Sequence, residues 1–161
     1  MPTTIADRHG RLTVKLTAAL YAVTFIHHLY GGLAFSSTER TVLAFVFSGA
    51  FAVTYLIYRH ALATRWGRRA YWLLVYVFWV GLLGLYEGGW NHTLFAVLRA
   101  GGVVNLDRLY AAASDARISD DVFFQATGVL TLLAAVVLGL APRLVGRRTP
   151  IAQTGHEDRA Q

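Results

Sequence analysis

The chain has 161 residues, of which 55% are hydrophobic and only 15% are charged. This composition is too apolar for an ordinary soluble domain and indicates an integral membrane protein with the lipid bilayer as its partner. The chain has no cysteine and a single methionine, Met1, which excludes disulfides, thiolate sites and thioether copper(I) sites. The net charge of +6 does not indicate nucleic-acid binding, because the basic residues lie between the apolar segments.

Four apolar segments are long enough, or nearly so, to cross a bilayer, which takes roughly 20 helical residues. They lie at about residues 16–35, 41–58, 70–88 and 122–141. We therefore predict an all-α fold, an integral membrane four-helix bundle that forms one domain over residues 1–145. The polar tail at 146–161 is expected to be disordered and cytoplasmic. A cleaved signal peptide is the alternative for the first segment, but its length and its two histidines argue against it.

Arginine and lysine residues predict the orientation, because cytoplasmic loops are enriched in them. Eleven lie in the two tails and in the link between segments two and three: Arg8, Arg11, Lys15, Arg59, Arg65, Arg68, Arg69, Arg143, Arg147, Arg148 and Arg159. Four lie on the other side: Arg40, Arg99, Arg108 and Arg117. We expect a multi-pass protein of the cytoplasmic (inner) membrane with both termini in the cytoplasm.

The link from Thr93 to Asp120 is long for a compact bundle, and long loops are usually functional or disordered. Apolar residues at 94–98 and 106–110 predict two short amphipathic helices at the outer surface, separated by Gly101 and Gly102. These helices would cap whatever the outer ends of the spans enclose.

Ionisable side chains inside the apolar segments are the most informative feature, because such groups are costly in a bilayer and usually mark a site. Two histidines lie in the first segment, a glutamate and a histidine end the third, and two aspartates begin the fourth. All fall in the outer half of the predicted bundle: His27, His28, Glu87, His92, Asp120 and Asp121.

Imidazole and carboxylate groups together suit a transition metal ion such as copper, zinc or iron. We predict a metal site drawn from these six residues, with Gln125, Tyr30 and Tyr86 as polar neighbours that orient the ligands. Haem b held by His92 and a histidine of the first segment is a weaker alternative. For the aspartates, capping of the fourth helix is the alternative.

Helical geometry leaves three difficulties. His27 and His28 point about 100° apart, so only one of them is expected to face the bundle centre. The pair also lies about 17 Å from the inner boundary, whereas Glu87 lies about 25 Å from it at 1.5 Å per residue. In addition, Glu87 and His92 are five residues apart, which is not a regular helical ligand spacing, so we expect Gly88 and Gly89 to unwind the helix there.

These features lead to one main functional hypothesis and two alternatives. The main hypothesis is a small membrane metalloprotein with an outward-facing site, for redox or metal-assisted chemistry on a lipophilic substrate or for metal handling. The first alternative is an accessory subunit of a larger membrane complex, or a homo-oligomer. The second is a component of proton-coupled transport, with Glu87 and the histidines as a relay.

Overall fold

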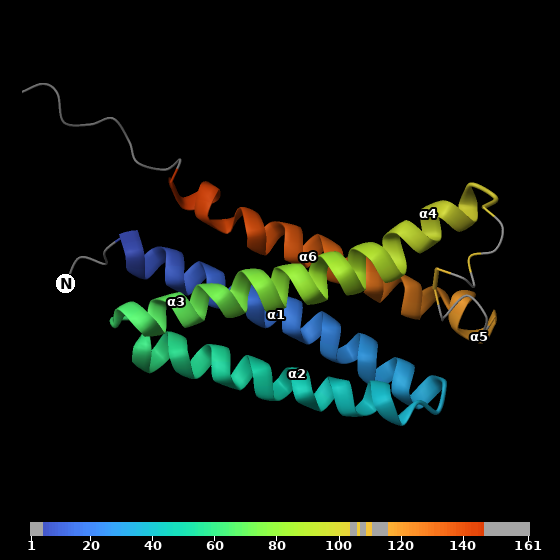
Figure 1. Ribbon diagram of the computed structural model, residues 1–161, viewed down its shortest axis with the longest axis horizontal. Helices are drawn as coiled ribbons and strands as arrows, with labels where there is room; N and C mark the ends of the chain where they lie inside the picture. Colours follow the sequence, from blue (N-terminus) through green and yellow to red (C-terminus); the bar gives the residue numbers. More distant parts are fainter. Residues whose placement is uncertain (1–4, 104–105, 107–108, 111–115, 147–161) are drawn as a thin grey trace, which may run out of the picture.

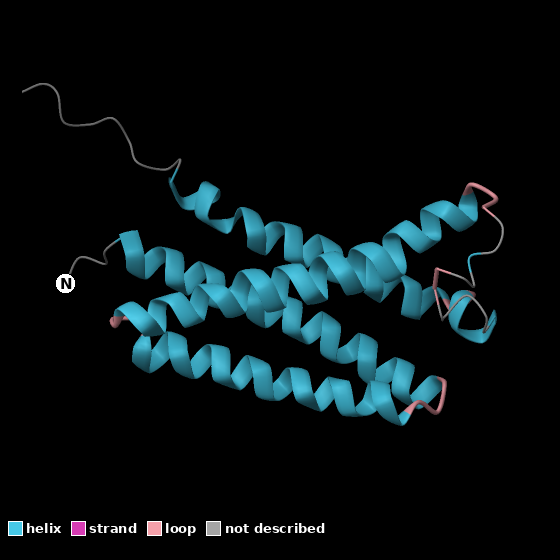
Figure 2. Ribbon diagram, in the orientation of Figure 1, coloured by secondary structure: helices cyan, strands magenta, loops and turns pink. Residues whose placement is uncertain are grey.

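The computed structural model describes residues 5–103, 106, 109–110 and 116–146, and it describes the side chains of residues 9–103, 106, 109–110 and 117–141. The described residues form helices and no strands, which confirms the predicted all-α four-helix bundle. The four long helical stretches of the chain lie side by side (Figures 1 and 2). The element order is α1 (Ile5–Ala34), α2 (Thr38–Leu56), η1 (Ile57–Ala61), α3 (Arg65–Leu73), η2 (Leu74–Leu94), α4 (Phe95–Ala100), α5 (Ala116–Ser119) and α6 (Val122–Gly146).

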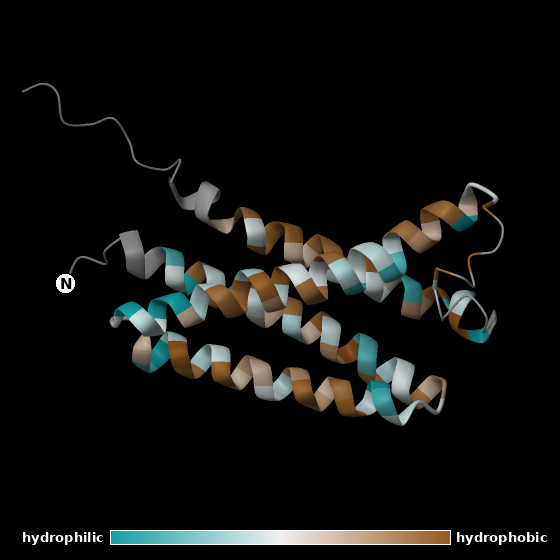
Figure 3. Cartoon of the chain, in the orientation of Figure 1, coloured by the Kyte–Doolittle hydropathy of each residue, from teal (hydrophilic) through white to brown (hydrophobic). Residues whose placement is uncertain are grey.

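Four helical stretches are long and apolar enough to cross a membrane. They are His9–Ala34, Thr38–Ala61, Arg65–Ala100 and Val122–Ala141. Figure 3 shows hydrophobic residues along the middle of these helices and hydrophilic ones concentrated toward their ends. The first three helical stretches are longer than the predicted apolar segments because they continue into these polar ends, whereas the fourth has the predicted bounds. The chain is therefore a multi-pass membrane protein by the length and composition of its helices.

The two ends of the bundle differ. The terminal end holds the start of α1, the η1–α3 connection and the C-terminal end of α6, whereas the far end holds the α1–α2 turn, α4 and α5 (Figure 1).

Side-chain caps mark the helix starts at both ends. Ser37 accepts from the Arg40 backbone N–H at the start of α2, and Thr64 accepts from the Gly67 N–H at the start of α3.

The third span is not a regular α-helix. Residues 74–94 form a π-helix, η2, whose backbone bonds i→i+5 make a wider turn than the 3.6 residues of an α-helix. The buried residues of this element recur every four residues, with an extra step of one between Leu83 and Gly84 that shows the wider turn: Val75, Trp79, Leu83, Gly84, Gly88 and His92. The π geometry therefore keeps one straight stripe of η2 against the rest of the bundle.

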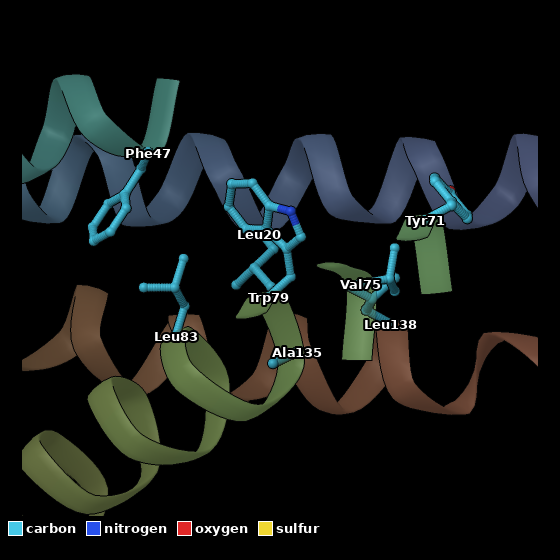
Figure 4. Close-up of a cluster of buried hydrophobic side chains, with 8 residues drawn as sticks. All are labelled: Leu20, Phe47, Tyr71, Val75, Trp79, Leu83, Ala135 and Leu138. Atoms are coloured by element: carbon cyan, nitrogen blue, oxygen red, sulfur yellow. The ribbon is translucent and has the colours of Figure 1, made fainter. Parts of the chain in front are cut away.

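The main core lies between α1, α2, η2 and α6 (Figure 4). Its centre is Trp79, which is fully buried and donates from Nε1 to Thr54 Oγ1 of α2 at 3.0 Å. This bond satisfies both polar groups in an apolar environment. The buried members are Leu20, Phe47, Tyr71, Val75, Trp79, Leu83, Ala135 and Leu138.

The link between the third and fourth spans differs from the predicted pair of surface helices. The first of these, α4, directly continues η2 and belongs to the third span. It ends at Gly101 and Gly102, and Gly102 adopts a φ of +73° that favours glycine. For the second, Leu106 and Tyr110 pack on Phe95 in a small buried cluster, whereas 104–105, 107–108 and 111–115 lie outside the described residues. The tail predicted to be disordered, from 147 onward, also lies outside them.

Candidate metal centre

Three imidazole rings converge on one carboxylate oxygen, about one turn beyond the Leu83 end of the core. Oε1 of Glu87 lies 3.7 Å from His27 Nε2, 3.9 Å from His28 Nε2 and 3.5 Å from His92 Nε2. The three histidines are 1%, 5% and 3% exposed. Among the described residues, His27, Glu87 and His92 form a group whose ligand atoms all lie within 4.8 Å of one another. The structure therefore brings three of the six predicted ligands into one group, and it places a fourth, His28, beside the carboxylate of Glu87.

Both members of the His27–His28 pair reach the site. The two rings are 5.1 Å apart and nearly perpendicular, at 73°. His27 stacks on Phe124 of α6 at 4.1 Å, whereas His28 packs on Phe47 of α2 at 4.8 Å. We expected only one of the pair to face the bundle interior, but the Nε2 atoms of both approach Glu87 from the two sides of α1.

The remaining nitrogen of each imidazole is held by a group that accepts a proton. His28 Nδ1 lies 3.1 Å from the backbone carbonyl of Thr24, which can only accept. His27 Nδ1 lies 2.9 Å from Thr127 Oγ1, and that hydroxyl has backbone carbonyls of α6 as acceptors for its own proton. Each of these two Nδ1 atoms is therefore the N–H donor of a neutral ring, which leaves its Nε2 with a lone pair directed at the site.

His92 is held in the same way by Gln125. Its Nδ1 lies 3.0 Å from Gln125 Oε1, and Gln125 Nε2 donates to the carbonyl of Ile118 at 3.2 Å. The second bond sets the amide orientation, so Oε1 faces the imidazole and accepts its N–H. The Nε2 atoms of His27 and His92 and the carboxylate oxygen of Glu87 thus form a close group of acceptors, and the Nε2 of His28 lies 3.9 Å from the same oxygen. The nitrogen lone pairs and the negative carboxylate repel one another, and a cation between them would stabilise the arrangement.

Glu87 connects the cluster to the surface of the bundle. Its Oε2 accepts from Asn91 Nδ2 at 2.7 Å, so Oε1 is the oxygen left for the histidines. The Glu87 side chain is 21% exposed, whereas the histidine side chains are 1–6% exposed. Glu87 is therefore the most exposed member of the cluster.

The π-helix removes both geometric difficulties of the third span. Glu87 and His92 are five residues apart, which in an i→i+5 helix places them on adjacent turns of one face. Thr93 follows the same spacing, because its Oγ1 donates to the Gly88 carbonyl at 2.8 Å. The helix is widened here and not unwound, contrary to our expectation. A wider turn also climbs less per residue, so Glu87 lies lower than α-helical counting predicts, level with the histidines.

Two glycines allow η2 and α6 to approach closely at the site. A Cβ on Gly128 of α6 would overlap the ring of His92, and a Cβ on Gly88 of η2 would lie 2.5 Å from the Leu132 backbone nitrogen. Small residues commonly permit such close helix approach in membranes. Without this approach, Gln125 and Thr127 of α6 would not reach the imidazoles.

The other predicted site residues occupy different environments. Asp120 forms an ion pair with Arg99, whose guanidinium also donates to the Ser119 carbonyl. Asp121 caps α6 by accepting from the Phe124 backbone N–H, and its second oxygen accepts from the Tyr30 hydroxyl at 2.8 Å. Helix capping, the alternative reading, thus describes Asp121. Tyr86 is 56% exposed on the surface of η2.

Sequence reasoning missed several residues that shape the site. They are Thr127, Asn91, Phe124 and the Thr24 carbonyl. The signal for Asn91 was available, because it is four residues after Glu87. The Thr24 carbonyl is likewise four residues before His28, at the usual α-helical distance. Thr127 and Phe124 carried no signal, since their role depends on how α6 packs on α1.

His27, Glu87 and His92 have ligand atoms close enough together to hold a small metal ion, and His28 Nε2 lies 3.9 Å from the same carboxylate oxygen. Four donors at about 2.0–2.2 Å from a tetrahedral ion lie about 3.3–3.6 Å from one another. The observed Nε2–Oε1 separations of 3.5, 3.7 and 3.9 Å need contractions of only a few tenths of an ångström. A haem between His27 and His92 does not fit. Two metal–nitrogen bonds of about 2 Å must lie end to end between the coordinating nitrogens, and half of each ring adds to that length, whereas the ring centroids are only 4.6 Å apart.

Comparison of the chain with protein-family models, with curated proteins and with solved structures gives no match. The local chemistry of the cluster is therefore the basis for any functional assignment. What the structure holds is a membrane-type helical bundle with a buried His/Glu group that could hold a metal ion.

Proposed function

We propose that this protein is a membrane metalloprotein that binds one transition metal ion. The ligands are Nε2 of His27, His28 and His92 and Oε1 of Glu87. The observation that carries the proposal is the convergence of these four acceptors, with every Nδ1 already engaged by Thr127, the Thr24 carbonyl or Gln125. Metal-bound histidines typically donate their second nitrogen in this way, which sets ring orientation and raises ligand basicity.

The same distances favour a metal over a proton relay. Proton transfer between an imidazole and a carboxylate needs a hydrogen bond of about 2.7–3.2 Å. The three separations here are 3.5–3.9 Å, and His27 Nε2 is buried with no hydrogen-bond partner among the described residues. A metal ion bonded to both atoms of each pair accounts for separations of this size.

The donor set suits copper, zinc and iron, because it combines borderline imidazole nitrogens with one carboxylate oxygen and has no soft sulfur ligand. Glu87 would bind through one oxygen, since Asn91 engages the other. When bound, such an ion supplies Lewis-acid or redox chemistry. The ligand cluster is most exposed on the side of Glu87. This exposure suits a lipophilic substrate or the transfer of the metal itself.

The metal assignment is tested by elemental analysis of the full chain purified in a mild detergent. We expect about one equivalent of copper, zinc or iron per chain in the wild type. Glu87→Gln and His92→Ala should each lose most of it, because each removes a ligand. His60→Ala and Asp120→Asn should retain it, since His60 is exposed in η1 and Asp120 pairs with Arg99. Equal metal content in the wild type and Glu87→Gln would contradict the proposal.

We further propose that the protein lies in the cytoplasmic membrane with both termini inside, which places the metal centre toward the outer face. The support is the excess of basic residues at the terminal end, eleven against four. Fusing a fluorescent reporter and a periplasm-dependent phosphatase separately to the C-terminus tests this orientation. We expect fluorescence and no phosphatase activity, whereas an active phosphatase would reverse the topology.

A further inference from the structure

A second site lies at the terminal end of the bundle, at the opposite end from the metal centre. A cavity of about 790 Å³ opens there between α1, η1 and the α3–η2 helix. The residues that define its chemistry are three arginines and three aromatics: Arg11, Arg59, Arg68, Tyr58, Trp72 and Tyr76. This volume lies in the range of ligand-binding pockets, about 300–1,000 Å³. We propose that the cavity binds the phosphate group of an anionic membrane lipid.

The charge of the cavity selects an anion. Arg11, Arg59 and Arg68 come from three different elements, and no acidic side chain among the described residues lines the cavity. Within the part of the chain that the structure describes, none of the three makes an ion pair or a side-chain hydrogen bond. Arg99 at the far end differs, because Asp120 and the Ser119 carbonyl occupy its guanidinium. The three cavity arginines thus keep their donors for a ligand, and guanidinium groups match phosphate oxygens well.

The aromatic residues place this charge at the level of lipid headgroups. Tyr58 lies near the end of the second span, and Trp72 and Tyr76 lie near the start of the third. The rings of Trp72 and Tyr76 stack at 5.6 Å and 22°. Tyrosine and tryptophan concentrate where spans meet the headgroup region. Figure 3 shows the hydrophilic residues gathered at this end, where η1 meets α3.

The apolar part of the cavity distinguishes a lipid from a soluble phosphate. Leu62 and the rings of Tyr58 and Trp72 line it beside the arginines, so it offers contacts that an inorganic ion cannot use. Tyr71 packs against both rings and is fully buried, yet its hydroxyl has no hydrogen-bond partner among the described residues. Basic pockets between spans on the cytoplasmic side commonly bind lipid headgroups of this kind.

The test uses the full chain in detergent micelles, with bound lipid counted by native mass spectrometry. Phosphatidylglycerol should bind at a defined stoichiometry and more tightly than phosphatidylcholine. The double variant Arg11→Gln/Arg59→Gln should weaken phosphatidylglycerol binding about 25-fold, at roughly fivefold per arginine. The matched control is Arg65→Gln/Arg69→Gln, which removes the same charge from the same end but does not line this cavity. It should change binding less than about threefold.

A second variant and a competition experiment complete the design. Ala63→Glu places a carboxylate at an exposed lining position and should also abolish binding, with helical content unchanged by circular dichroism. Inorganic phosphate and glycerol phosphate should compete only weakly. The lipid assignment would be overturned if either soluble phosphate displaced the lipid at equal concentration. It would also be overturned by equal binding of the two lipids, or by equal losses in the two double variants.

Discussion

Gln125 holds His92 through a single hydrogen bond from Nδ1, and its own amide is held by the Ile118 carbonyl. A bond of this kind sets which nitrogen faces the metal and how the ring is turned. It is the contact by which α6 acts on a ligand of η2, just as Thr127 acts on His27 of α1. The ligands and their supports therefore come from three of the four spans.

Gln125→Ala should weaken metal binding about 10–100-fold, because the His92 ring loses the acceptor that orients it. Gln125→Glu should restore most of the affinity, since it keeps an acceptor oxygen for the Nδ1–H group. Affinity is measured by competition with a chromophoric chelator. A role limited to packing predicts instead that both variants bind metal like the wild type.

At the scale of elements, the π-helix η2 decides where the site forms. Its wide turn places Leu83, Gly88 and His92 on the buried stripe while bringing Glu87 to the edge of the same face. In a regular α-helix, successive steps of four residues rotate by about 40°, so this stripe would wind away from α6. The close approach of α6 then depends on glycine at positions 88 and 128.

Gly128→Ala should displace the His92 ring, because the added methyl group would overlap it. We expect loss of most bound metal and a decrease in stability of about 1–3 kcal/mol, as for other overpacked sites. Gly49→Ala is the matched control, since a Cβ there has no heavy atom within 4 Å. Thermal unfolding in detergent and metal content are measured together. Similar results for the two variants would show that the close approach at Gly128 is unimportant.

On the scale of the whole molecule, the metal centre joins helices that otherwise share little contact. α1 packs mainly on α2 and α6, and η2 packs mainly on α6. His27 and His28 of α1 meet Glu87 and His92 of η2 at the site, so a bound ion ties these two helices together directly. The core around Trp79 holds the bundle on the terminal side of this link.

Removal of the metal by a chelator should therefore lower the unfolding temperature. At a free metal concentration about 1,000 times the dissociation constant, binding to the folded state contributes about 4 kcal/mol, which corresponds to roughly 10 °C for a chain of this size. The effect should vanish below about pH 5, because protons compete with the metal for the imidazole nitrogens. Differential scanning fluorimetry with and without chelator measures it. In Glu87→Gln the chelator should have no effect. A decrease in unfolding temperature as large as that of the wild type would refute the link between the metal and the two helices.

The sequence by itself determined the fold class, the four spans and the residues worth testing. Apolar runs of bilayer length admit few structures other than helices, and titratable groups within such runs stand out because burying them is costly. His27, His28, Glu87 and His92 were all identified on this ground, and Gln125 was added as a polar neighbour. These inferences depend only on local composition, which the chain carries without reference to its packing.

Only the tertiary structure decided which of these residues meet. Asp121 caps α6 and Asp120 pairs with Arg99, although the sequence places both aspartates in the same half of the bundle as the site. His27 and His28 both reach Glu87 because the carboxylate lies between the directions in which they point. The level of Glu87 and the five-residue step to His92 follow from the π geometry of η2. Helix pitch, helix approach and ring orientation arise from packing among distant segments, so local periodicity alone could not predict them.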